Sequence, residues 1–98
     1  MTINKQKNGT SLTLAVAGRL DTVTSPDLEA VLKEELNGIE NLTFDFSALD
    51  YISSAGLRVL LSAQKQMNKQ GDMKVTGVSE IIMEIFEVTG FSDILTIE

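Results

Sequence analysis

The sequence contains no cysteine and no histidine among its 98 residues. Without cysteine, the chain has no disulfide, no thiol nucleophile and no thiolate metal site. Without histidine, a serine nucleophile lacks its usual general base. The lysine nearest in sequence to the pair Ser53 and Ser54 is Lys65, about three helical turns further on, and no G-x-S-x-G motif is present. We therefore predict a protein that is not an enzyme and needs no cofactor.

Long apolar runs and positive charge are also scarce. No apolar run approaches the ~20 residues that span a bilayer, and the N-terminus lacks the apolar segment of a signal peptide, so we expect a cytoplasmic protein without membrane insertion. The net charge is −6, from 8 basic and 14 acidic residues spread along the chain. This charge disfavours direct binding to nucleic acid. With a single proline and no linker, the chain indicates one domain covering residues 1–98.

Two further kinds of site have weak signals. Three acids lie at or after the ends of predicted strands and could meet around a cation: Asp21, Asp45 and Asp50. Because their spacing does not require this, we predict no metal site. Gly18-Arg19 lacks both the glycine spacing and the lysine of a phosphate-binding loop.

Periodicity and turn residues give the order of elements. Asn8-Gly9 is a strong signal for a type I′ hairpin turn, and Leu12, Leu14 and Val16 alternate with small or polar residues as in a half-buried strand. The predicted order is strand 2–7, strand 10–17, loop 18–24, a helix capped by Ser25 and ended by Gly38, strand 39–46, a helix from the serine pair to Gly71, strand 73–78, a helix from Ser79 to Gly90, and strand 94–97.

This order, β-β-α-β-α-β-α-β, predicts an α/β domain. A hairpin is followed by alternating units, which need right-handed crossovers and a mixed, mostly parallel β-sheet with helices packed on it.

The serine pair allows two interpretations. Serine is a common helix N-cap, so one hydroxyl can serve only to cap the second helix, worth about 1 kcal/mol. Alternatively, one serine is a phosphorylation site at a helix N-terminus, where backbone N–H groups and the helix dipole accommodate an anion. The residues alone leave both interpretations open.

Residues 45–61, DFSALDYISSAGLRVLL, closely resemble the signature of STAS domains, in particular the bacterial anti-sigma factor antagonists. Residues 18–21, GRLD, resemble the family's G-x-L-D loop before its first helix. The resemblance continues through the predicted strand 73–78 and the third helix to residues 89–91, and so spans almost the whole chain.

The resemblance implies a single STAS-like domain that takes part in a partner switch. The unphosphorylated antagonist binds an anti-sigma factor that is also a serine kinase with a histidine-kinase-like ATPase fold. Phosphorylation by this kinase releases the antagonist, and a PP2C-type phosphatase restores binding. The family's phosphorylated serine lies two residues before a glycine-leucine pair, which implies Ser54. Ser53 is the second choice and stands where well-known members carry an acid.

The same resemblance implies a partner-binding surface that surrounds the serine pair. Arg58, one helical turn after Ser54, can pair with a partner acid or with the phosphate, or can be an ordinary solvated charge. For the nearby Ser25 we expect helix capping. The predicted partner-binding residues are Asp21, Thr22, Thr24, Ser53, Ser54, Ala55, Gly56 and Arg58.

Two other functions remain open. The chain can be a constitutive STAS interaction subunit of an ABC-type transporter or another regulatory complex, in which the serine is only a cap. It can also be a nucleotide-binding sensor, which only Gly18-Arg19 favours. For the antagonist we expect a monomer or weak dimer.

Overall fold

The computed structural model describes residues 1–98 and contains three α-helices and one five-stranded sheet. None of the helices is long and apolar enough to span a bilayer. In chain order the elements are β1 (Thr2–Asn8), β2 (Ser11–Leu20), α1 (Ser25–Glu35), β3 (Asn41–Asp45), β4 (Leu49–Ile52), α2 (Ser54–Gln70), β5 (Asp72–Thr76), α3 (Glu80–Thr89) and the short 3₁₀ turn η1 (Phe91–Asp93).

The sheet is mixed and mostly parallel, as predicted. β1 and β2 form an antiparallel hairpin, and β2, β3 and β5 follow side by side in parallel. β4 runs parallel to β2 as well, but it pairs with the last residues of β2, while β3 pairs with the first half. The long strand β2 is therefore central to the sheet. Along one edge it pairs first with β3 and then with β4.

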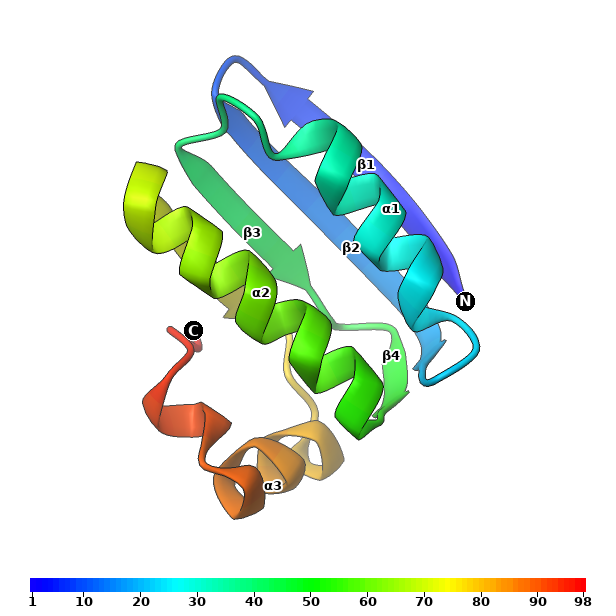
Figure 1. Ribbon diagram of the computed structural model, residues 1–98. Helices are drawn as coiled ribbons and strands as arrows, with labels where there is room; N and C mark the ends of the chain where they lie inside the picture. The colour runs from blue at the N-terminus through cyan, green and yellow to red at the C-terminus, as the bar shows by residue number, and fades with distance from the viewer.

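Two layers enclose the main core. Figure 1 shows α1 and α2 lying side by side across one face of the sheet. On β2 the residues Leu12, Leu14 and Val16 point to this face and are fully buried, whereas the alternate residues are only half-buried. α3 buries Ile82 and Phe86, packs against β4, and lies at the end of the molecule where α2 begins (Figure 1).

The hairpin turn lies one residue later than the Asn8-Gly9 prediction. Asn8 pairs with Ser11, so Gly9 and Thr10 form the loop. Only Gly9 has a positive φ, 63°, whereas a type I′ turn needs positive φ at both central residues. The turn therefore has the pattern of a type II′ turn, in which only the first central residue has positive φ.

β4 was not predicted, and neither was the extension of β2 to Leu20 through the expected loop 18–24. The two findings have one cause. The second half of β2 needs a partner for its backbone groups, and β3 ends at Asp45, too early to supply one. After β3 the chain turns, and β4 then lies beside the second half of β2. At the start of this pairing the Gly18 N–H donates to the Ala48 carbonyl (3.0 Å).

The helix ends match the prediction in part. Ser79 caps α3, since its hydroxyl accepts from the Ile82 N–H (3.3 Å), and Gly90 ends α3 in the left-handed region with φ 82°. The prediction that Ser25 caps α1 is wrong. Thr24 holds the N-cap position, and Ser25 is buried and donates to the Asp21 carbonyl.

The predicted strand 94–97 is reduced to one bridge. Ile97 pairs with Val75 in parallel, while Phe91–Asp93 form the η1 turn. The Val75 N–H donates to the Thr96 carbonyl and the Glu98 N–H donates back to the Val75 carbonyl, both at 2.9 Å. The chain end thus continues the sheet beyond β5 over a very short length.

The packing of α2 on the sheet generates a prediction for Gly56→Ala. A Cβ atom at Gly56 would lie 2.8 Å from side-chain carbons of both Ile52 and Leu20, and 3.0 Å from the Leu20 carbonyl oxygen. Alanine favours a helix over glycine by about 1 kcal/mol, but the overlap with a backbone oxygen and two buried side chains outweighs this gain. We expect a net loss of about 1 to 3 kcal/mol in unfolding free energy, measured by urea denaturation.

Ser62→Ala is the matched control, because Ser62 is an exposed residue of the same helix. Its unfolding free energy should change by less than about 0.5 kcal/mol. A Gly56→Ala protein as stable as the control would contradict the close packing of α2 on β2.

Candidate functional site

The serine pair lies where β4 runs into α2, beside the end of β2. The Ser53 N–H donates to the Leu20 carbonyl (2.9 Å), which extends the pairing of β4 with β2 up to the first turn of α2. The loop Asp21 to Thr24 leaves β2 at this same point and leads into α1. Two segments that are distant in sequence, the β2–α1 loop and the start of α2, are thereby brought together.

The two serines differ sharply in accessibility. Ser54 is the first residue of α2 and is exposed. Ser53 holds the N-cap position with extended backbone angles, yet its side chain makes no capping hydrogen bond. The Ser53 Oγ is buried and has no hydrogen-bond partner. Of the two serines, Ser53 thus occupies the cap position without a capping hydrogen bond, and Ser54 is the exposed one.

A network centred on Asp21 holds the β2–α1 loop in one conformation. The Asp21 carboxylate accepts from the N–H groups of Val23 (3.0 Å) and Thr24 (3.1 Å). The Thr24 hydroxyl accepts from the Asp21 N–H (2.9 Å) and donates to the Arg19 carbonyl (2.8 Å). Together with the bond from buried Ser25 to the Asp21 carbonyl, these contacts fix the loop that borders Ser54.

These contacts also set the charge state of the loop. Hydrogen bonds from the Thr24 N–H, the Thr24 hydroxyl and the Val23 N–H, together with the charge of Arg19, hold the pKa of the Asp21 carboxyl below its usual value, against an opposing effect of desolvation. The largest of these contributions is the Thr24 N–H. Asp21 is therefore an anion at neutral pH, and its role is to order the loop.

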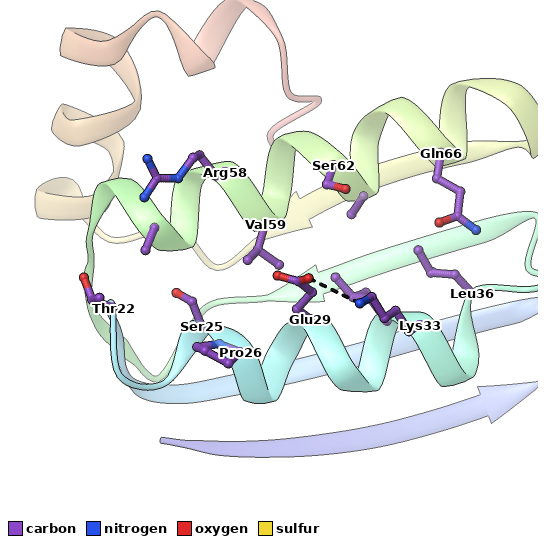
Figure 2. Close-up of a pocket in the computed structure, with 13 residues that line it drawn as sticks. Thr22, Ser25, Pro26, Glu29, Lys33, Leu36, Arg58, Val59, Ser62 and Gln66 are labelled. Atoms are coloured by element: carbon purple, nitrogen blue, oxygen red, sulfur yellow. Dashed lines mark ion pairs between the residues drawn. The ribbon is translucent and has the colours of Figure 1, made fainter.

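The remaining predicted residues fall into two groups. Thr22, Ala55 and Arg58 line an open groove of about 510 Å³ between α1 and α2, whereas Gly56 is buried and supports the packing of α2 instead of contacting solvent. Figure 2 shows the exposed Arg58 side chain directed back toward the start of α2. No ion pair engages Arg58 within the chain; the Glu29–Lys33 pair (3.6 Å) lies further along the groove.

Three exposed residues near the serine pair were not predicted. The Arg19 guanidinium lies 4.5 Å from the centre of the Tyr51 ring, and its Nε lies 3.7 Å from Asp21 Oδ2. Val23, at the tip of the loop, is 83% exposed. A signal was present in the composition: Arg19 and Arg58 are the only arginines and Tyr51 is the only tyrosine, and both residue types are enriched in binding hot spots.

The acids do not form a cation site. No group of three or more carboxylates is placed to hold a metal ion. The Asp45 carboxylate instead accepts from the Ser47 N–H (3.0 Å) and the Ser47 hydroxyl (2.8 Å), which together lower its pKa. Asp21 and Asp45 each order a turn that follows a strand.

Comparison with known proteins gives one consistent family. The family model of the STAS domain matches residues 2–98. The chain is 31% identical over 97 residues to the anti-sigma-B factor antagonist of Listeria monocytogenes, covering 96% of this chain and 84% of that protein. It is 32% identical over 82 residues to the anti-sigma-B factor antagonist of Staphylococcus aureus, covering 82% of this chain and 76% of that protein.

Solved structures share the fold at lower identity. The anti-sigma factor antagonist SpoIIAA in its unphosphorylated form has a TM-score of 0.78 at 12% identity, covering 99% of this chain and 87% of that one. The Bacillus cell fate determinant SpoIIAA in its phosphorylated form has a TM-score of 0.77 at 13% identity, covering 99% and 91%. At these identities the likeness shows the fold.

The Asp21 network generates a prediction for Thr24→Val. This change removes the hydroxyl while it keeps the backbone N–H, so the pKa of Asp21 should rise toward its usual value of about 3.8. Carboxyl carbon chemical shifts followed by NMR against pH measure it. Because the folded-state pKa is depressed, the stability that ionised Asp21 contributes is present above about pH 3.8 and is lost as the pH falls through the folded-state pKa. The part of the unfolding free energy that is lost on acidification through Asp21 should therefore be smaller in Thr24→Val.

Asp45 is the internal control, because its pKa depends on Ser47 and not on Thr24. Equal shifts at Asp21 and Asp45, or none at Asp21, would contradict the role assigned to the Thr24 hydroxyl.

Proposed function

The chain belongs to the STAS domain family, and from this premise we propose that it is an anti-sigma factor antagonist whose binding to an anti-sigma factor is controlled by phosphorylation of Ser54. The relatives from Listeria monocytogenes and Staphylococcus aureus, which match most of its length, carry the name anti-sigma-B factor antagonist. The observation that carries the proposal is the exposed Ser54 hydroxyl, presented by the first residue of α2 on a fixed scaffold.

The position of Ser54 suits a phosphate. At the first turn of a helix the backbone N–H groups are not used by the helix, and the positive end of the helix dipole favours an anion. Arg58 lies one turn further along α2, where residues four apart are neighbours on the helix surface. Its guanidinium has no partner within the chain. A phosphate on Ser54 can therefore be carried without unfolding α2.

Ser54 is preferred over Ser53 for a steric reason. A kinase must bring its nucleotide to the serine oxygen, and the Ser53 Oγ is buried. Modification at Ser53 would require its side chain to leave this buried position, on a backbone held by the hydrogen bond between the Ser53 N–H and the Leu20 carbonyl.

Phosphorylation would act on the partner, not on the fold. A phosphate carries between one and two negative charges at neutral pH. At about 4 Å from a carboxylate in an interface of effective dielectric near 20, each charge raises the energy by about 4 kcal/mol, or nearly a thousandfold in affinity. The gain from the helix dipole is only about 0.3 to 1 kcal/mol. The repulsion across the interface is the larger effect, so modification should release the partner.

The surface around Ser54 fits a protein partner. Val23 offers an exposed apolar contact, and Tyr51 with the stacked Arg19 offers a half-exposed aromatic one. The Asp21 network holds the loop beneath Val23 in place before binding, which lowers the entropy lost on association. We assign Asp21, Thr22 and Thr24, with Arg58, to this partner-binding surface.

The resemblance to the family also implies which proteins add and remove the phosphate. The anti-sigma factor would be the kinase itself, a serine kinase with a histidine-kinase-like ATPase fold, and a PP2C-type phosphatase would remove the phosphate. The chain in this proposal is the substrate of both enzymes and has no catalytic residue of its own.

The test is phosphorylation with the cognate anti-sigma kinase and ATP, with the modified residue located by mass spectrometry. We expect one phosphate, on Ser54, and none on a Ser54→Ala protein. The Ser53→Ala protein is the matched control and should be modified at Ser54 like the unaltered chain. The phosphorylated chain should bind the kinase at least a hundredfold more weakly, in keeping with the repulsion of about 4 kcal/mol per charge.

Two outcomes would contradict the proposal. Phosphate on Ser53 alone would move the site to the buried hydroxyl. A chain that binds the kinase but is modified on neither serine would be a constitutive interaction subunit.

A further inference from the structure

The third helix has an exposed apolar stripe that the fold does not use. α3 faces the core with Ile82 and Phe86, which are fully buried. Ile81 and Val88 lie on the outside, 63% and 81% exposed, with half-buried Ile85 between them. Positions 81, 85 and 88 follow the spacing of one helical face. α3 is therefore apolar on two faces, and only one of them is covered.

The same helix carries an unpaired row of acids. Glu80, Glu84 and Glu87 are all exposed, α3 contains no basic residue, and none of the three takes part in an ion pair. At 100° per residue, these three glutamates lie side by side, next to Val88 and Ile81. The exposed surface of α3 thus has an acidic side and an apolar side. We define the α3 face as the five exposed residues Glu80, Ile81, Glu84, Glu87 and Val88.

Helix stability accounts for only one of the three acids, Glu80, because an acid in the first turn is favoured by the helix dipole. Glu80 and Glu84, and Glu84 and Glu87, are at spacings where like charges repel. Glu87 also lies in the last turn of α3, where the negative end of the helix dipole disfavours an acid. On α1, by contrast, Glu29 is paired with Lys33 one turn later (3.6 Å). Glu84 and Glu87 have no such compensation within the chain.

The charge of the α3 face selects among possible occupants. A second copy of the chain would bring its own three glutamates against these, and the chain as a whole carries a charge of −6, so a symmetric contact through α3 would oppose like charges. A partner with lysines or arginines beside an apolar stripe would instead pair the acids and cover Ile81 and Val88 at once. An amphipathic helix has this distribution of side chains.

We propose that the α3 face is a docking site for a basic amphipathic helix of another protein. The site goes beyond the proposed role of Ser54, because none of the α3 face residues belongs to the β2–α1 loop or to α2. Contact with the partner would give this domain a second interaction surface, made by residues of α3.

The test uses the whole chain and a synthetic probe peptide of about 18 residues, five helical turns, with leucines on one face and lysines on the other. NMR amide shifts should map its binding to residues 80–89. Fluorescence anisotropy should show affinity about tenfold weaker for Glu84→Lys and for Val88→Ser, as expected for central contacts. Both side chains are exposed, and circular dichroism should confirm an unchanged fold.

Glu34→Lys is the matched control. Glu34 is an exposed, unpaired acid on α1, so this variant makes the same change in net charge away from α3. It should bind the probe within about twofold of the unaltered chain, because the removed charge lies outside the contact. A peptide with glutamates in place of the lysines should not bind.

Three results would overturn the proposal. Equal weakening by Glu34→Lys and Glu84→Lys would show attraction to net charge alone. Amide shift changes confined to α1 and α2 would place the bound peptide elsewhere on the domain. Absence of binding would show that the α3 face is not a docking site. A concentration-dependent dimer that Val88→Ser abolishes would show that a second copy covers the face. None of these results would alter the outcome of the Ser54 phosphorylation test.

Discussion

The first turn of α2 packs directly against the end of β2 because Gly56 has no side chain, and the rest of the candidate site depends on this close approach. Leu20 and Ile52 lie against the glycine, at distances that leave no room for a Cβ atom. The Ser53 N–H can then reach the Leu20 carbonyl and continue the pairing of β4 with β2. At this junction the hydroxyl of Ser53 is buried, whereas the next residue, Ser54, is exposed. The two adjacent serines therefore differ in which one is available to another protein.

This arrangement suits a regulated binding surface. The β2–α1 loop is held by the Asp21 carboxylate and the Thr24 hydroxyl, and the start of α2 is held by β4, so both sides of the surface are ordered before a partner arrives. The helix dipole accommodates a phosphate at the start of α2 at little energetic cost. A charge added there changes the potential that a partner meets and leaves the core of the domain intact. The switch that we propose is therefore electrostatic.

The sequence predicted what is encoded locally. The three helices, the hairpin and the strands β2 and β3 follow from short-range periodicity and from turn residues such as Gly9 and Gly90. β4 was missed because its residues, Leu49–Ile52, do not alternate in polarity, and the strand exists only because the end of β2 needs a partner. The stacking of Arg19 on Tyr51 was missed for the same reason, since it depends on the register between β2 and β4. The family resemblance indicated Ser54, but the burial of the Ser53 hydroxyl required the three-dimensional packing.

The central claim is that phosphate on Ser54 changes the surface of the domain and not its fold. The most direct measurement is a comparison of backbone amide NMR shifts before and after modification by the kinase, with the Ser54→Ala chain as the unmodified control. We expect amide shift changes only in the β2–α1 loop, at the end of β4 and in the first turn of α2. Large shifts that extend to the hairpin turn at Gly9 and Thr10 and to the first residues of β3 and β5, at the opposite end of the sheet from this site, would contradict it.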